Sequence, residues 1–197
     1  MNMKSTLALL VLLTACTTPA PRPVEDPQQS WQHYSQWLGR LTHWDIQGRI
    51  ALRSYDQAVN ANLHWKQDGD SYAIELTGPL GQGGVSLQGT ADSARLITGD
   101  VDEVATDAQA LLFAHTGYVL PLEALRYWIR GLPQPDVGSQ HTLDDQGRLA
   151  QVQQAPWQVR FRAYALYGDH TLPHKVFVEN HQLSVRVVID QWVLPRS

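Results

Sequence analysis

Hydrophobic and polar residues alternate along much of the chain after residue 43, with the period of two that marks a strand with one buried face. The links between the alternating segments are short and contain turn residues such as Asp68, Gly69 and Asp70. Such short links favour antiparallel neighbours over parallel strands joined by crossovers. The pattern therefore predicts about ten strands in one curved antiparallel sheet. The clearest segments are 44–52, 59–65, 72–76, 85–89, 157–163 and 183–189.

A segment near residue 31 shows instead the spacing of an amphipathic helix. Apolar residues stand at positions 31, 34, 37 and 38, which lie on one face of a helix. Pro27 and Ser30 are start signals for this helix, and Gly39 is a stop signal. The sequence therefore predicts a short N-terminal helix that follows Ser30 and ends at Gly39.

Two further helices are expected in the middle of the chain. Thr106 and Gln109 have the spacing of a capping box, and Gly117 would end the helix that they begin. Pro121 opens the next helix, and Gly131 ends it. The apolar residues that these two helices would bury are Ala108, Leu111, Leu112, Leu122, Leu125, Trp128 and Ile129.

Together these elements predict a mainly β protein with short helices. The part from Trp31 to Ser197 is long enough for a single domain with a sizeable core, and it contains no internal repeat or second linker. A barrel of eight or more strands can be filled by its own side chains or can hold one ligand. The alternation alone leaves both possibilities open.

The N-terminus carries targeting signals. An early lysine, Lys4, precedes an apolar run over residues 7–13 that is too short to cross a bilayer as a helix and is typical of a secretory signal peptide. The run ends in Leu-Thr-Ala-Cys at 13–16, which resembles the bacterial lipobox, in which the cysteine is acylated and becomes the first mature residue. Cys16 is the only cysteine, so no disulfide is expected. We predict a signal peptide over 1–15 and an N-acyl and S-diacylglycerol lipid on Cys16.

A tether is expected to follow, over residues 16–30. From Thr17 to Ser30 the chain contains four of its eleven prolines and almost no large apolar residue, which indicates an extended spacer. Two acyl chains suffice for stable membrane anchoring. By resemblance to bacterial lipoproteins, a residue other than aspartate after the cysteine indicates the outer membrane, facing the periplasm. We therefore expect a single domain, residues 31–197, held close to that membrane.

The formal net charge of -4 argues against nucleic acid or an acidic lipid surface as the main partner. Four cations lie on the polar faces of the predicted strands. The simplest interpretation is a solvated surface, and the alternative is a basic rim that meets an acidic carrier or lipid headgroups. These cations are Arg49, Arg160, Arg162 and Arg186.

The link over residues 78–84 reads Gly-Pro-Leu-Gly-Gln-Gly-Gly. Pro79 fixes φ and the glycines allow positive φ, so the backbone chemistry is that of a surface turn. Leu80 has no apolar neighbour in this turn. Two roles stay open for it: the side chain packs back onto the core, or, together with Pro79 and Gly81, it forms a membrane-insertion loop whose tip dips into lipid.

Longer stretches follow the lipobox-like motif and the spacer in a definite order. They read GRIAL at 48–52, LHWKQDGDSYAIELTGPLG at 63–81, GYVLPLEALRYWIRGLP at 117–133, PWQVRFRAY at 156–164, LPHKVFV at 172–178 and VRVVIDQW at 185–192. In this order and spacing, the chain resembles the LolB family, the outer-membrane receptors of the lipoprotein-localisation pathway. The resemblance extends over essentially the whole mature chain.

The resemblance implies an unclosed antiparallel β-barrel of about ten to eleven strands, covered by helices and enclosing a hydrophobic cavity. It implies that this cavity receives the acyl chains of lipoproteins from the periplasmic carrier LolA, and that the cargo is then inserted into the inner leaflet of the outer membrane. The expected partners are LolA, cargo lipoproteins and outer-membrane phospholipid, with no nucleic acid. We expect a monomer without a cofactor other than the lipid on Cys16.

The wall of the hypothesised cavity is drawn from the inward faces of the predicted strands and of the third helix. For each of these residues, packing in the core is the alternative role, because large apolar side chains mostly fill a small barrel. The residues assigned to the acyl-chain cavity are Ile46, Ile50, Leu52, Leu63, Trp65, Ile74, Leu76, Leu125, Trp128, Phe161, Val187 and Ile189.

Two other classes of function are compatible with parts of the sequence. His170 and His174 are four residues apart, but Pro173 disfavours a helix that would bring them onto one ligand-bearing face. The sequence contains no Walker-type loop, G-x-S-x-G elbow or HExxH motif, so we expect neither catalysis nor a metal site. The remaining alternative is a structural or assembly-partner lipoprotein of the outer membrane that has no acyl-chain cavity.

Overall fold

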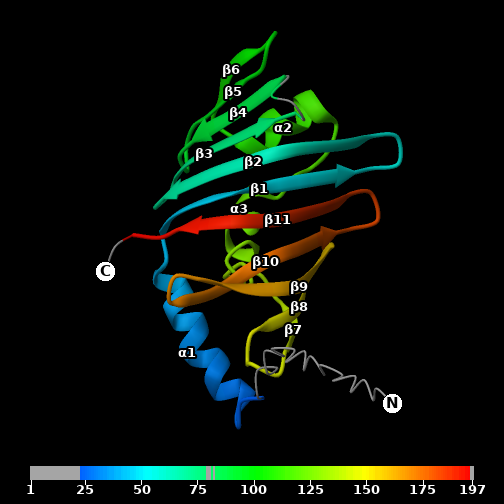
Figure 1. Ribbon diagram of the computed structural model, residues 1–197. Coiled ribbons are helices and arrows are strands. Elements are labelled where there is room, and N and C mark those ends of the chain that lie inside the picture. Colours follow the sequence, from blue (N-terminus) through cyan, green and yellow to red (C-terminus); the bar gives the residue numbers. More distant parts are fainter. Residues whose placement is uncertain (1–22, 79–80, 82, 196–197) are drawn as a thin grey trace, which may run out of the picture.

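Eleven strands form one antiparallel sheet (Figure 1) in this computed structural model, which describes residues 23–78, 81 and 83–195. The edge strands of the sheet, β6 and β7, do not pair with each other, so the barrel is unclosed. The predicted mainly β fold with a single unclosed antiparallel sheet is confirmed. The strands are β1 (His43–Arg53), β2 (Ala58–Asp68), β3 (Ser71–Thr77), β4 (Gly84–Gly89), β5 (Ala94–Ile97), β6 (Asp102–Ala105), β7 (Gln140–Leu143), β8 (Leu149–Gln154), β9 (Trp157–Tyr167), β10 (His170–Glu179) and β11 (Ser184–Val193).

The sheet consists of two meanders that meet at its centre. Strands β1 to β6 follow one another on one side and β7 to β11 on the other, and antiparallel pairing of β1 with β11 joins the two halves. The chain must therefore travel from edge strand β6 to the opposite edge strand β7. Helices α2 (Ala108–Thr116) and α3 (Leu122–Trp128) lie in that connection and cover one face of the sheet (Figure 1).

The covered face holds the core. Ile46 on β1 pairs with Trp65 on β2 and with Trp192 on β11, and all three side chains are buried. The ring centroid of Trp44 lies 5.2 Å from that of Trp65 and 5.5 Å from that of Trp192. From α3, Trp128 and Ile129 just after its end are each only 1% exposed. The alternation read from the sequence therefore gives the correct inward face for the central strands.

A β-bulge in the central pair of strands depends on one glycine. The register of β1 against β11 shifts between Gln47 and Gly48. A Cβ atom on Gly48 would lie 2.0 Å from the carbonyl oxygen of Val188. Only glycine permits this close approach of two backbones.

Helix α1 (Pro27–Arg40) begins earlier than predicted. The Asp26 carboxylate accepts hydrogen bonds at 2.9 and 3.0 Å from two backbone N–H groups of the first turn. Gly39 lies inside the helix and does not end it. The predicted start after Ser30 and the assignment of residues 27–30 to an extended spacer are therefore wrong, because an aspartate cap followed by proline is the stronger start signal.

The other two helices are close to the prediction, with one correction. Asp107, and not a capping box of Thr106 and Gln109, caps α2, because its carboxylate accepts hydrogen bonds at 2.8 and 3.2 Å from two backbone N–H groups. Gly117 ends α2 at a φ of 73°, as predicted. Gly131 follows α3 at a φ of 87°, a conformation that favours glycine.

Candidate functional site

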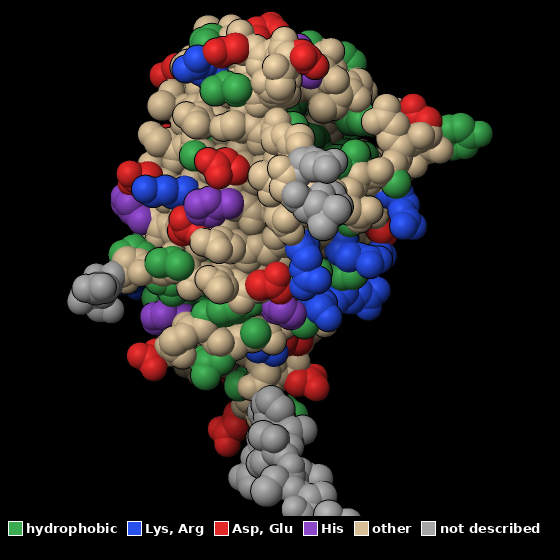
Figure 2. Space-filling model, turned by 45° about the horizontal axis from the view of Figure 1, so that its top comes forward, with side chains coloured by type: hydrophobic (Ala, Val, Ile, Leu, Met, Phe, Trp, Pro, Cys, Tyr) green, Lys and Arg blue, Asp and Glu red, His purple; other side chains and the backbone are tan. Residues whose placement is uncertain are grey.

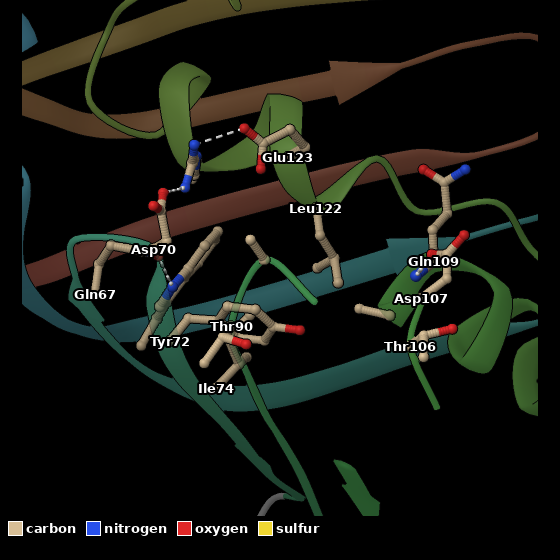
Figure 3. Close-up of a pocket in the computed structure, with 14 residues that line it drawn as sticks. Gln67, Asp70, Tyr72, Ile74, Thr90, Thr106, Asp107, Gln109, Leu122 and Glu123 are labelled. Carbon is tan, nitrogen blue, oxygen red and sulfur yellow. Dashed lines mark hydrogen bonds and ion pairs between the residues drawn. The ribbon is translucent and has the colours of Figure 1, made fainter. Parts of the chain in front are cut away.

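A pocket of about 660 Å³ lies between the covered face of the sheet and the two helices (Figure 3). Strands β2 and β3 form one wall, the segment before α2 forms a second, and the first turn of α3 forms a third. Its volume falls within the range of pockets that bind small ligands or parts of larger ones. It exists because the connection from β6 to β7 crosses the sheet without filling this part of its covered face.

One section of the pocket lining is apolar and firmly held. Trp65 and Ile74 contribute from the sheet, and Leu122 contributes from α3. The indole Nε1 of Trp65 donates a 3.0 Å hydrogen bond to the side chain of Gln67. The amide nitrogen of Gln67 donates in turn to backbone carbonyl oxygens at 2.9 and 3.2 Å in the adjacent β2–β3 turn. These bonds fix the tryptophan ring in the pocket wall.

The rim of the pocket is charged. The guanidinium group of Arg126 lies between the carboxylates of Asp70 and Glu123, which are both labelled in Figure 3, at N···O distances of 3.0 and 2.7 Å. Arg126 and Glu123 belong to α3, whereas Asp70 belongs to the β2–β3 turn. This ion-pair bridge holds α3 against the sheet along one side of the pocket.

Tyr72 combines an apolar ring with an unpaired hydroxyl in the pocket wall. Its ring lies over Gly89, where a Cβ atom would come within 2.5 Å of the Tyr72 hydroxyl oxygen. That hydroxyl is buried, and among the described residues it has no hydrogen-bond partner. Burial, with a smaller contribution from Asp107, raises the pKa of Tyr72, so the side chain is neutral at neutral pH.

The residues assigned to the cavity from the sequence all lie on the covered face or in the core. Trp65 and Ile74 line the pocket. Ile50, Leu52 and Leu76 are half-buried and pack against the core. The buried members that do not line this pocket are Ile46, Leu63, Leu125, Trp128, Phe161, Val187 and Ile189.

Several pocket residues were not in that assignment. Tyr72 belongs to the alternating segment 72–76 and Leu122 to the apolar residues of the third predicted helix, but nothing in these patterns distinguishes a residue beside a cavity from one in a filled core. The charged rim of Asp70, Glu123 and Arg126 was missed because its members come from a turn and a helix that meet only in the folded chain.

Two loops lie at the end of strands β2 and β3 that is opposite the charged rim of the pocket. There the hairpin over residues 54–57 joins β1 to β2, and the loop over 78–83 joins β3 to β4. Val59, on the covered face beside the first hairpin, is 47% exposed. Gly81 is exposed with a φ of 74°, whereas Pro79 and Leu80 lie outside the described residues, as does Cys16.

The histidine pair takes part in ordinary packing and hydrogen bonding. The ring of His170 stacks against Trp37 at a centroid distance of 4.4 Å, and Nδ1 of His174 lies 2.7 Å from the carbonyl oxygen of Ile189. In the described part of the chain, no group of three or more His, Cys, Asp or Glu residues is placed to hold a metal ion. No helix among these residues is long and apolar enough to cross a membrane.

Two solved structures have a fold similar to that of this chain. A LolA superfamily protein from Nitrosomonas europaea superposes with a TM-score of 0.55 at 7% sequence identity, over 86% of this chain and 94% of that one. A putative outer membrane lipoprotein-sorting protein domain from Vibrio parahaemolyticus gives a TM-score of 0.54 at 11% identity, over 87% of this chain and 94% of that one. At these identities the similarity establishes the fold alone.

Sequence comparison identifies the family as well as the fold. The chain is 41% identical to the outer-membrane lipoprotein LolB of Alkalilimnicola ehrlichii, over 95% of this chain and 94% of that protein. It is 38% identical to the outer-membrane lipoprotein LolB of Nitrosococcus oceani, over 95% of both chains. The family model for outer membrane lipoprotein LolB matches residues 42–192, which include all of the sheet except Val193, the last residue of β11. The chain therefore belongs to the LolB family of outer membrane lipoproteins.

Proposed function

We propose that this protein is an outer-membrane receptor that takes acylated lipoproteins from a soluble periplasmic carrier of the LolA type and inserts them into the inner leaflet of the outer membrane. The pocket between the covered face of the sheet and helices α2 and α3 carries this proposal, since Trp65, Ile74 and Leu122 give it an apolar wall section beside a polar and charged rim. Membership of the LolB family and the names of its outer-membrane relatives support it.

The physical requirement of the task matches this architecture. Each methylene group exposed to water costs about 0.8 kcal/mol, so an acyl chain must pass from one apolar site to another without entering solvent. An unclosed sheet with a helical cover provides a site that can widen, because no hydrogen bonds join its two edge strands. In this proposal the acyl chain lies along Trp65, Ile74 and Leu122.

The membrane end of the transfer rests on features beyond the described residues. In this proposal the lipid on Cys16 anchors the chain to the outer membrane, and the loop that contains Pro79, Leu80 and Gly81 inserts into the lipid. Leu80→Glu is then expected to leave cargo acceptance unchanged and to reduce delivery to membranes. Normal delivery by this variant would reject a role for Leu80 in insertion.

Filling the pocket tests the receptor role. Ala108 lines the pocket at the start of α2, whereas Ala110, two residues later, is exposed. Ala108→Trp should abolish acceptance of an acylated lipoprotein from the soluble carrier, and Ala110→Trp should retain it. Acceptance is measured as transfer of labelled cargo from the purified carrier, and circular dichroism checks that both variants fold.

The same assay addresses the competing function. If the parent chain takes no cargo from the carrier and binds no hydrophobic probe, it acts as a structural or assembly-partner lipoprotein. If Ala108→Trp accepts cargo like the parent, the receptor role stands but the acyl chain occupies another site.

A further inference from the structure

The outer face of the sheet, away from helices α2 and α3, carries a concentrated group of cations. Figure 2 shows Lys and Arg side chains gathered on one area of the surface. Six of the fifteen Lys and Arg residues of the chain fall on four adjacent strands, and we refer to them as the basic patch. The basic patch consists of Arg49 and Arg53 on β1, Arg160 and Arg162 on β9, Lys175 on β10 and Arg186 on β11.

Strand register brings these cations side by side. Arg186 pairs with Phe177, and Phe177 pairs with Arg160, so these three side chains form one row across β11, β10 and β9. In the next row, Val188 has Arg49 on one side and Lys175 on the other. With strands about 4.8 Å apart, the patch is about 14 Å wide from β1 to β9.

The charge of the patch is only partly neutralised. Asp190 pairs with Arg49 at 3.1 Å, and Glu179 pairs with Arg160 at 2.7 Å. Within the described ranges, the other four cations of the patch form no ion pair. The guanidinium of Arg186 lies 4.7 Å from the ring centroid of Phe177, which keeps its donor edge free for another partner. A strongly positive area thus exists on a chain whose net charge is -4.

An exposed aromatic residue projects beside the patch. Arg53 is the last residue of β1, and the hairpin that follows presents Tyr55, whose exposure of 104% is that of a free side chain. This hairpin is held in place, because the Tyr118 hydroxyl donates a hydrogen bond to Asp56 and the Ser54 hydroxyl lies 2.7 Å from the Tyr118 oxygen. An exposed tyrosine on a hydrogen-bonded hairpin next to cations is typical of a surface that meets the interface of a bilayer.

We propose that the basic patch binds the phosphate groups of anionic phospholipids at the membrane surface, while Tyr55 enters the interfacial layer. Guanidinium groups bind phosphate oxygens with two parallel hydrogen bonds, and clustered cations are drawn to anionic bilayers. The patch and Tyr55 lie at or near the strand end that also carries the loop over residues 78–83. The inference deepens the proposed function and rests on it, since it determines which side of the receptor faces the membrane that takes up the cargo.

Vesicle binding tests the inference with the mature chain, residues 16–197, carrying Cys16→Ala, so that affinity reports the protein surface and neither the signal peptide nor the lipid anchor. A triple variant, Arg53→Gln with Lys175→Gln and Arg186→Gln, removes unpaired cations from the patch. Each basic residue near an anionic membrane surface increases the binding affinity by a factor of about five. The triple variant should therefore bind vesicles of phosphatidylcholine and phosphatidylglycerol on the order of 100-fold more weakly than the parent. Parent binding should also fall steeply as salt rises.

A charge-matched control separates a local patch from overall charge. Arg40→Gln with Lys66→Gln and Arg95→Gln removes three exposed cations elsewhere and should leave vesicle binding within a few-fold of the parent. Tyr55→Ser should weaken binding to vesicles of either composition, because the tyrosine contributes apolar area at the interface.

Three outcomes would overturn the inference. The first is that the triple variant binds vesicles as tightly as the parent. The second is that the triple variant and the control lose vesicle affinity equally. The third is that the triple variant loses only cargo capture from the carrier, which would make the patch a protein-docking surface. Failure of the proposed function is a separate result, since a parent chain that takes no cargo can still bind anionic vesicles through the patch.

Discussion

At the scale of single residues, Gly48 is the glycine of the described sheet at which an added Cβ atom would make the shortest contact. Gly48→Ala places a methyl group against the Val188 carbonyl oxygen and should lower the free energy of unfolding by about 2 kcal/mol or more. Gly39→Ala is the matched control, because Gly39 lies inside α1 with open space around its Cβ position and should gain about 0.5–1 kcal/mol. Urea unfolding of both variants measures the two changes, and a Gly48→Ala variant as stable as the parent would contradict the bulge geometry.

His64 gives the sheet a pH-dependent contact on its outer face. Its Nε2 atom lies 2.9 Å from an Asp45 carboxylate oxygen, and its Nδ1 atom lies 3.7 Å from Glu75. The hydrogen bond to Asp45, with the charges of Asp45 and Glu75, raises the pKa of His64 above its ordinary value despite the opposing effect of burial. The stabilisation is therefore complete below the unfolded-state pKa and disappears as pH rises through the higher folded-state pKa.

His64→Gln should consequently destabilise the protein more at about pH 5.5 than at about pH 8.5, relative to the parent. The difference should stay below about 1 kcal/mol, because the pair is partly exposed and screened by solvent. His33→Gln, on the exposed surface of α1, is the control that removes a histidine outside the sheet. Equal destabilisation by His64→Gln at both pH values would show that the imidazole contributes by packing alone.

At the scale of elements, helix α1 connects the predicted tether to the sheet. The Tyr34 hydroxyl donates a 2.6 Å hydrogen bond to the carbonyl oxygen of Thr171, and Trp37 stacks on His170. Both contacts hold the helix against the β9–β10 hairpin. Because α1 begins at Pro27, the spacer between the folded part and Cys16 is shorter than the sequence suggested.

The N-cap of α1 can be tested directly. Asp26→Ala leaves two backbone N–H groups of the first turn without their acceptor and should cost about 1 kcal/mol of stability. Glu25→Ala changes the charge equally at the neighbouring exposed position and should be nearly neutral. If thermal or urea unfolding shows the same loss for both variants, charge and not capping explains the effect.

At the scale of the whole molecule, the order of strands determines where the sheet is firm and where it can open. β1 and β11 lie at the centre and join the two meanders, whereas β6 and β7 are four-residue edge strands with one neighbour each. Edge strands of this length are held by few contacts and open locally at low cost. The pocket is roofed by the connection between these two edges, so movement there changes access to it.

Native-state hydrogen exchange should reflect this arrangement. Backbone amides paired between β1 and β11 are expected to exchange only on global unfolding, while those of β6 and β7 exchange through local opening. Binding of an acylated ligand should slow exchange in α2 and α3 more than in β1, since the helices roof the pocket. Uniform exchange rates across the sheet would contradict a firm centre with mobile edges.

Part of the site could be predicted from the sequence. The alternation correctly placed Trp65 and Ile74 on the inward face, and the glycine after α2 ended that helix as predicted. It did not distinguish the wall of the pocket from the packed core, because both require apolar residues at the same period. Nor did it show the Asp70–Arg126–Glu123 bridge, whose partners are brought together only when α3 folds over the sheet.

By itself, the sequence determined the class of fold, the inward faces of the strands, the glycine-rich links and the family, because these follow from local periodicity, turn chemistry and the order of motifs. Only the tertiary structure decided where space remains between sheet and helices, and which distant cations share one surface. Net charge is a sum over the whole chain, whereas a partner contacts only one face, so the net charge does not show how cations are distributed among faces. The basic patch arises because antiparallel register aligns Arg49, Lys175 and Arg186 from three strands.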